Sequence, residues 1–343
     1  MEMGILGLPQ SGKSTLFEIM TGTKSSASHT ETCVRGQAAV PDERFDQLVE
    51  IYQPVKVSPA KVPFVDVHAV GDHPWESVRQ NLSGTDAILH VVDGFSLPDV
   101  QVCIDSYRKL EDELILSDLL IIEKKLERLT KMSKKALSPQ DISQVEILPK
   151  LKDILEAGKP LRAAGLTEAE VFTLRSFSFW SIKPELVVIN VAEDNIALAD
   201  AFAMAANLTE PVIGICCKIE AELASLDAAD QKEFLATLGI AEPAFGRIIR
   251  GAFSLLGRIS YFTSGKDEVK AWVIPKGSKA PKAAGAIHND FERGFIKAEV
   301  MSFDDFIACG KTEAAVKSAG RMRLEGKEYI VKDGDIITFR FNI

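Results

Sequence analysis

The chain has 343 residues, of which 46% are hydrophobic and 26% charged, and its formal net charge is −9. This length favours two or three globular domains, and the acidic balance argues against general nucleic-acid coating and against DNA-specific binding. The longest apolar stretch, residues 186–192, is too short to span a bilayer, and no signal pattern opens the chain. We therefore expect a cytoplasmic protein without membrane contact.

The chain opens with a phosphate-binding pattern. Residues 4–17, GILGLPQSGKSTLF, predict a short strand, a tight loop and the start of a helix. In the pattern G-x-x-x-x-G-K-[ST], backbone amides surround the β-phosphate, the lysine reaches the β- and γ-phosphates, and the serine hydroxyl coordinates Mg²⁺. The helix dipole favours the same anion. The predicted nucleotide-binding residues are Pro9, Gln10, Ser11, Gly12, Lys13, Ser14 and Thr15. The alternative is a glycine-rich structural turn.

A second acidic group is needed to hold the metal and to sense the γ-phosphate. Asp66 lies at the end of an apolar strand, in PFVDVHAVG, where such a carboxylate is expected. We predict Ser14 and Asp66 as metal ligands, and Lys13 as a catalytic residue. The alternative for Asp66 is an acidic residue in a turn at the end of the strand.

Further apolar runs predict a parallel, doubly wound α/β sheet. Short β-branched runs occur at residues 63–67, 87–93, 185–191 and 211–217, and helical segments separate most of them. His90, inside one such run, is expected to be a core residue. Between the runs at 87–93 and 185–191, apolar spacings of three to five predict a helix over residues 106–132. Pro139 ends or restarts this helix, and a second stripe follows, so we predict an inserted helical hairpin.

The residues that bind the base of the nucleotide are predicted to follow the later strands of the sheet. VVINVAED places Asn190 and Glu193 as in the N-K-x-D pattern of guanine-binding proteins, but with Val191 for lysine and glutamate for aspartate. The aspartate of that pattern accepts two hydrogen bonds from guanine, so these changes argue against strict guanine specificity. The following strand leads into GICCKIEAE, and its candidate base-pocket residues are Cys216, Cys217 and Lys218.

The last 85 residues predict a small β-rich domain with turns at LEGK and KDGD. These segments also carry a resemblance to a known family. The quoted phosphate loop, FVDV, TDAILHVV, KPELVVINVAED, APKAAGAIHNDFERGFIKAEVMSFDDFI and AGRMRLEGKEYIVKDGDIITFRFN resemble the YchF, or Obg-like ATPase, subgroup of the Obg-related P-loop NTPases. The resemblance covers nearly the whole chain.

The resemblance implies a Ras-like G domain, a helical insertion and a C-terminal β-grasp (ubiquitin-like TGS) domain. The corresponding ranges are 1–103 with 183–258, 104–182 and 259–343. It also implies that the protein prefers ATP to GTP or accepts both, requires Mg²⁺, and associates with ribosomes. The sequence leaves the oligomeric state open.

Several positions depart from the family pattern. Gln10 and Ser11 replace Asn-Val, of which the asparagine binds a monovalent ion in related enzymes, and His68-Ala69 replaces the Ala-Gly after the switch aspartate. Counting back from GQAAVPDERFD places Thr30 at the Mg²⁺-binding threonine, with Thr32 a close second. A histidine that some members carry after the HVV strand is absent. We therefore expect slow hydrolysis with little potassium stimulation, and His68 is the candidate water-orienting residue.

Three functions are compatible with these residues. They are a switch ATPase that hydrolyses slowly on the ribosome, a nucleotide-dependent binding module with negligible hydrolysis, and a P-loop kinase for a small substrate. The long inserted helix and the C-terminal domain supply candidate contacts to rRNA phosphates, namely Lys124, Arg128, Lys131, Lys135, Arg321, Arg323 and Lys327. The alternative for the helical residues is a solvated face paired with neighbouring glutamates.

Overall fold

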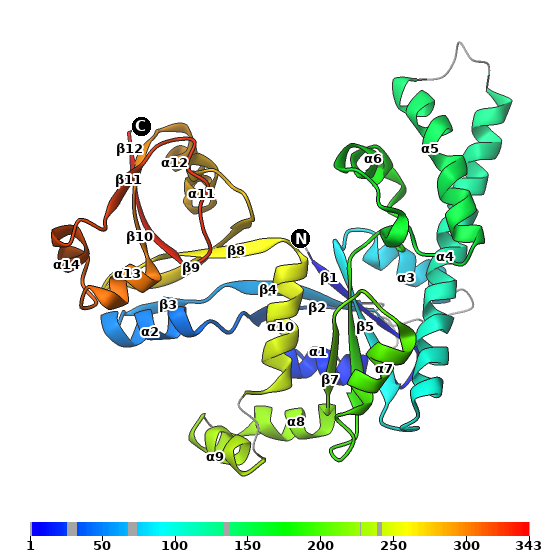
Figure 1. The fold of residues 1–343 in the computed structure, drawn as a ribbon, viewed down its shortest axis with the longest axis horizontal. Coiled ribbons are helices and arrows are strands. Elements are labelled where there is room, and N and C mark those ends of the chain that lie inside the picture. The colour runs from blue at the N-terminus through cyan, green and yellow to red at the C-terminus, as the bar shows by residue number, and fades with distance from the viewer. Residues whose placement is uncertain are drawn as a thin grey trace. The chain divides into compact units, whose positions relative to one another are not determined.

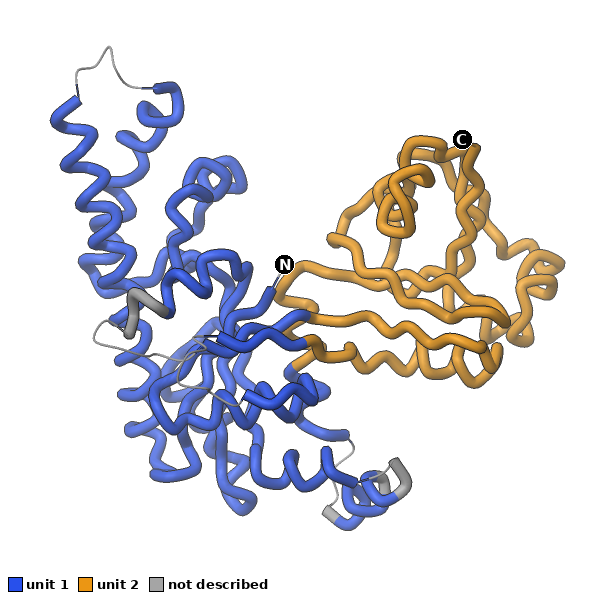
Figure 2. Tube along the Cα trace, turned by 180° about the vertical axis from the view of Figure 1, so that it is seen from behind, with its two compact units in different colours: residues 1–36, 63–248 blue, residues 37–62, 249–343 orange. Residues whose placement is uncertain are grey.

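A computed structural model describes residues 2–25, 33–67, 74–132, 138–226, 228–238 and 242–342. The chain forms two compact units, residues 1–36 with 63–248 and residues 37–62 with 249–343 (Figure 2). Each main sheet has six strands. Within the described ranges, no helix is both long enough and apolar enough to cross a membrane.

The first sheet carries the phosphate-binding loop (Figure 1). Its strands lie in the order β2-β4-β1-β5-β6-β7, and the pairs β4–β1, β1–β5, β5–β6 and β6–β7 are parallel. This confirms the predicted parallel α/β sheet. The strands are β1 (Met3–Gly7), β2 (Cys33–Ala39), β4 (Lys61–Val67), β5 (Ala87–Gly94), β6 (Glu185–Val191) and β7 (Val212–Ile215).

Helices connect the parallel strands, because a parallel neighbour can be reached only by a crossover. One side of β5 and β6 packs against two helices, α4 (Val100–Lys131), which follows β5, and α7 (Leu198–Ala206), which follows β6. Their shared buried core includes Tyr107 and Phe202. The crossover helices and those after β7 are α1 (Lys13–Thr21), α3 (Pro74–Leu82), α7 (Leu198–Ala206), α8 (Cys217–Ser225), α9 (Ala228–Leu238) and α10 (Ala244–Leu255).

The predicted helical hairpin is present between β5 and β6. The long helix starts earlier than predicted, because the Asp99 carboxylate accepts hydrogen bonds from the N–H groups of Gln101 and Val102 and caps it. Ser138 forms a capping box at the second helix, and Pro139 occupies its first turn. The elements are α4 (Val100–Lys131), α5 (Pro139–Glu156), η2 (Leu161–Ala164), α6 (Glu168–Leu174) and η3 (Arg175–Phe177).

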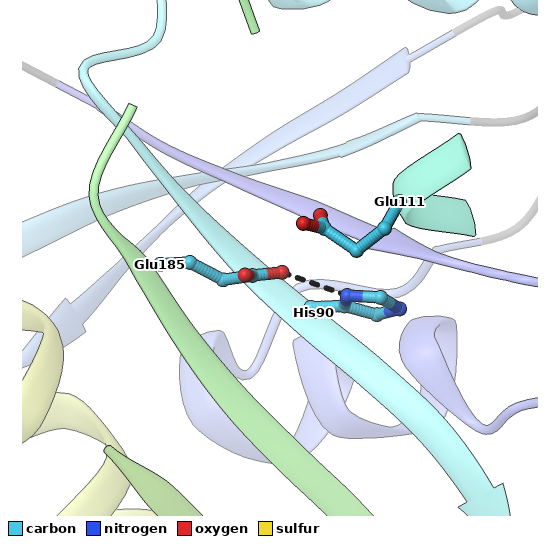
Figure 3. Close-up of side chains that lie close together, drawn as sticks. All are labelled: His90, Glu111 and Glu185. Carbon is cyan, nitrogen blue, oxygen red and sulfur yellow. Dashed lines mark hydrogen bonds and ion pairs between the residues drawn. The ribbon is translucent and has the colours of Figure 1, made fainter. Parts of the chain in front are cut away.

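A buried charged cluster joins the base of this hairpin to the sheet. His90 on β5 is buried as expected, and its Nδ1 lies 2.7 Å from Glu185 Oε1 on β6 (Figure 3). Arg162 on η2 forms ion pairs with Glu185 and with Glu111 of α4. The three residues drawn in Figure 3 are of metal-ligating types, but the Arg162 guanidinium already supplies a cation between the two glutamate side chains.

The cluster predicts a specific pH dependence of stability. Burial, with the Glu185 charge, raises the pKa of Glu111 from 4.5 to about 8. The folded state then holds a proton that the unfolded chain has released, so stability falls as the pH rises from about 4.5 to 8. Glu111→Gln removes this titrating group and with it the pH dependence that it causes. Urea unfolding should show the parent losing at least about 1 kcal/mol more than Glu111→Gln between pH 5.5 and 8. Parallel pH profiles would contradict this assignment.

The second unit contains a mixed sheet in the order β11-β10-β12-β8-β9-β3. The β-rich character predicted for the C-terminal segment is present, and its turns lie near LEGK and KDGD. The strands are β3 (Lys56–Ser58), β8 (Arg258–Thr263), β9 (Glu268–Pro275), β10 (Phe295–Ser302), β11 (Arg323–Glu325) and β12 (Asp335–Phe341). The helices are α2 (Glu43–Tyr52), α11 (Ala280–Ile287), α12 (Asn289–Arg293), α13 (Phe303–Ala308) and α14 (Glu313–Ser318).

Residues 37–62 fold with this second unit, although the sequence analysis placed them in the N-terminal domain. Strand β3 pairs in parallel with β9, with Lys56 opposite Glu268 and Ser58 opposite Lys270. Arg44 of α2 forms an ion pair with Asp333 at 2.8 Å. The partners are more than 200 residues apart in sequence, and local patterns therefore do not reveal the pairing. The insertion and TGS-like boundaries stay predictions.

Candidate nucleotide-binding site

The phosphate-binding loop follows β1 and leads directly into α1. Gly12 has a φ of 91°, a left-handed conformation, and a Cβ at this position would lie 2.5 Å from Asn190 Nδ2. Glycine is therefore required by both conformation and space. Gln10 also has a positive φ, 66°, and its side chain is exposed. Such a conformation is unusual for a residue with a side chain and is found preferentially at functional sites.

The start of α1 is suited to an anion. Gly12 provides no side-chain hydrogen bond to the first turn, and the first turn has no acidic residue. The first N–H groups of a helix have no partner within the helix and carry the positive end of its dipole. Pro9 and Thr15 flank this turn with exposed side chains. A phosphate group would satisfy these N–H groups, as the sequence predicts.

Lys13 and Asp66 supply opposite charges beside this turn. Burial lowers the pKa of Lys13, while the nearby Asp66 carboxylate acts in the opposite direction and raises it. Asp66 is fully buried on β4, paired in register with Ile5 of β1. Its Oδ2 accepts a hydrogen bond from Ser25 Oγ at 2.7 Å, whereas Oδ1 is buried and has no hydrogen-bond partner among the described residues.

The predicted metal ligands fit a hard divalent cation. Mg²⁺ binds oxygen ligands and keeps several waters, so a serine hydroxyl and a nearby carboxylate are suitable donors. Ser14 lies in the first turn of α1 next to Lys13, and a metal-bound water would give Asp66 Oδ1 the partner that it lacks among residues 2–25, 33–67 and the other described ranges. Thr30, Thr32 and His68 lie outside the described residues.

The base-binding end is tied to the phosphate-binding loop through Asn190. Its Nδ2 donates to the Ser11 carbonyl at 3.2 Å, and its Oδ1 accepts from the Cys217 N–H at 3.3 Å. The structure therefore brings together residues from three separate sequence segments. Glu193 and Lys218 are exposed, and neither has a hydrogen bond to the predicted site residues within the described ranges. Val191 is buried in the core, so it does not replace the base-covering lysine.

The two cysteines at the base end are buried. Burial raises the pKa of Cys217 to about 12, so this residue is a neutral thiol at physiological pH and not a nucleophile. Cys216 lines a cavity of about 350 Å³ together with Ile215, Ile219 and Glu220. The predicted phosphate-binding residues are not among those lining this cavity. It is therefore distinct from the phosphate-binding turn.

Sequence reasoning missed Ser25 and Glu18. Ser25 lies in KSSASHT, which has no periodicity and matches no catalytic pattern, and Glu18 lies in an ordinary amphipathic helix. The buried hydrogen bond between His90 and Glu185 was also missed, although ionisable residues in two apolar strands were a usable signal. Ser25 and Asp66 are 41 residues apart and His90 and Glu185 are 95 apart, so only the short Ser25–Glu18 contact lies within one sequence segment.

Comparison with known proteins identifies the family. "Ribosome-binding ATPase YchF" of Bacillus subtilis (strain 168) is 38% identical over 363 residues, covering 99% of both chains. The chain belongs to the YchF family. Another relative, "Obg-like ATPase 1" of Oryza sativa subsp. japonica, is 36% identical and covers 100% of this chain and 92% of its own. The family resemblance stated from the sequence is thereby confirmed.

Further comparisons agree with this assignment. The solved "Structure of the Schizosaccharomyces pombe YchF GTPase" matches with a TM-score of 0.85 and 29% identity, over 99% of this chain and 97% of that chain. A family model named YchF-GTPase_C, with the description "Protein of unknown function (DUF933)", matches residues 258–342. The YchF fold, a P-loop G domain with a C-terminal domain, is therefore that of this chain.

Proposed function

We propose that this chain is a ribosome-associated switch protein that binds Mg·ATP and hydrolyses it slowly. The observation that carries this proposal is the uncapped start of α1, beside Lys13 and the buried, half-satisfied Asp66 carboxylate. Relatives named as ribosome-binding ATPases support the ribosomal partner. A module that binds nucleotide with negligible hydrolysis is the second candidate. Gln10 favours it, because this residue replaces the asparagine that binds a monovalent ion in related enzymes.

The predicted phosphate- and metal-binding residues each have a definite role in this proposal. The N–H groups of residues 10–15 and the Lys13 ammonium bind the phosphates and spread the charge that develops on them. Ser14 and Asp66, with Thr30 as the expected third ligand, would hold Mg²⁺, which neutralises charge on the β- and γ-phosphoryl oxygens. His68 is the candidate to orient the attacking water. Phosphoryl transfer depends mainly on such positioning and charge stabilisation.

A phosphate-release assay tests the proposed function and separates its two candidates. Purified protein is incubated with ATP and MgCl₂, alone and with ribosomes, while calorimetry measures nucleotide binding. Slow release that ribosomes accelerate supports the switch ATPase. Tight binding without release in either condition supports the binding module. Absence of ATP and GTP binding overturns both.

We expect ATP to bind at least as tightly as GTP. Glu193 replaces the aspartate that reads guanine, and Val191 lies in the core instead of covering the base. Competition of each nucleotide against a fluorescent analogue gives the ratio of dissociation constants, and Glu193→Ala shows how far that carboxylate contributes. A hundredfold preference for GTP, about 2.7 kcal/mol, would contradict this expectation.

Ribosome contact is proposed through the helical insertion, the C-terminal domain or both. The basic stripe predicted on the long inserted helix consists of Lys124, Arg128, Lys131 and Lys135. On α4, Lys131 pairs with Glu127 at 2.6 Å and Arg128 lies 3.8 Å from Asp141, so part of this stripe is already neutralised. Lys124 is exposed, and Lys135 lies outside the described residues. In the second unit, Arg321 and Arg323 already form ion pairs with acidic residues, whereas Lys327 is exposed.

Charge reversal on α4 tests this contact. The triple variant Lys124→Glu, Arg128→Glu, Lys131→Glu should lower co-sedimentation with ribosomes about tenfold at low salt, because phosphate contacts dominate affinity there. The matched control, Arg108→Glu with Lys109→Glu, changes exposed bases near the other end of the same helix. Equal effects of the two variants would indicate non-specific charge, and no effect would assign the stripe to a solvated face.

A further inference from the structure

Ser25 connects α1 to Asp66 through two hydrogen bonds. Its N–H donates to Glu18 Oε1 at 2.7 Å, and its hydroxyl donates to Asp66 Oδ2 at 2.7 Å. Glu18 lies on the same helix that begins with Lys13, and Ser25 is itself 9% exposed. The position of the Asp66 carboxylate is therefore defined relative to α1 by a third segment.

This connection leaves the two oxygens of Asp66 in different states. Oδ2 has the Ser25 hydroxyl as a partner, whereas Oδ1 is buried and finds no hydrogen-bond partner in the part of the chain that the structure describes. Burying a carboxylate oxygen without a hydrogen-bond partner is costly, and Lys13 lies close enough to interact electrostatically with Asp66. A hydrated divalent cation would supply the missing hydrogen bond. Because the Ser25 bond restricts rotation of the carboxylate, it determines which oxygen stays available.

We propose that Ser25 is a positioning residue for the divalent cation of the nucleotide site. It acts through Asp66, and Glu18 anchors it. This inference rests on the proposed function, since it requires Mg·nucleotide to bind at the start of α1. Loss of the Ser25 hydroxyl frees the Asp66 carboxylate to rotate, which weakens the metal-dependent part of nucleotide binding and leaves the metal-independent part unchanged.

The test measures binding of a fluorescent ATP analogue to the full chain during a MgCl₂ titration and, separately, in EDTA. Ser25→Ala should raise the MgCl₂ concentration for half-maximal binding about tenfold, equivalent to about 1.4 kcal/mol. Its affinity in EDTA should stay within about twofold of the parent. Ser25→Thr, which keeps a hydroxyl, should stay within about twofold in both conditions.

A matched control comes from the C-terminal unit. Ser302 Oγ donates to Asp305 Oδ2 at 2.7 Å, the same pair of groups at the same distance, and Ser302→Ala should change neither measurement. If Ser25→Ala does not fold, as judged by circular dichroism, Glu18→Gln decides, because it weakens the anchor and keeps the hydroxyl. At least a threefold shift in the MgCl₂ requirement supports the proposal, and no shift overturns it.

Other outcomes distinguish this inference from the proposed function. Unchanged Mg²⁺ dependence in a folded Ser25→Ala, while the parent binds Mg·ATP, overturns the inference alone. Equal weakening in MgCl₂ and EDTA also overturns it, since it assigns Ser25 a general structural role. A parent that binds no nucleotide overturns the proposed function and this inference together.

Discussion

Lys13→Ala is expected to abolish measurable Mg·ATP binding. The ammonium is partly buried beside Asp66 at the start of α1, and in the proposed site it is the side chain that binds the phosphates. Charge-assisted hydrogen bonds of this kind are about twice as strong as neutral ones, and low-dielectric surroundings increase their effect. Without Lys13, the bound phosphates would face the Asp66 carboxylate without this compensation. We expect at least a hundredfold loss of affinity by calorimetry, about 2.7 kcal/mol or more.

Two further variants make this result specific. Ser14→Ala should likewise abolish Mg·nucleotide binding, while retaining more affinity in EDTA than Lys13→Ala does, because the hydroxyl acts through the metal. Lys109→Ala, at an exposed lysine on α4, should bind like the parent. If Lys13→Ala or Ser14→Ala bound as tightly as the parent, the nucleotide would have to bind elsewhere.

Arg162→Met is expected to lower the free energy of unfolding by about 3–5 kcal/mol, the usual cost of removing one partner from a buried ion pair. The Arg162 side chain is 8% exposed and forms ion pairs with Glu111, Glu185 and Glu210. The methionine keeps apolar volume but provides no cation, so the buried Glu185 is left with His90 and Tyr107 as its hydrogen-bond partners. Such a loss is a large share of the stability of an ordinary domain.

Urea unfolding at pH 7 provides the measurement for this variant. Arg175→Met is the matched control, because Arg175 is exposed and packs over the ring of the exposed Phe172, and its effect should stay within about 0.5 kcal/mol. A loss below about 1 kcal/mol for Arg162→Met would show that the cluster is solvated.

The sequence by itself determined the features that depend on neighbouring residues. The phosphate-binding loop is a contiguous pattern, and the buried strand Glu185–Val191 was predicted with the bounds that the structure has. Apolar spacing predicted the helical hairpin, because the same face of a helix recurs every three to four residues. Within the hairpin, α4 starts earlier than predicted, since one polar side chain, Asp99, caps the helix before its apolar stripe is evident, and the strand predicted at 211–217 ends at Ile215, because Cys217 begins α8.

Only the tertiary structure decided which distant groups meet. Ser25 and Asp66 are separated by 41 residues, and His90 and Glu185 by 95, so no local pattern records either pair. The assignment of residues 37–62 to the second unit likewise depends on strand pairing between β3 and β9. A hydrogen bond forms wherever folding places a donor within reach of a buried acceptor. Sequence patterns indicate which groups need partners, and the packing of segments determines which partners they obtain.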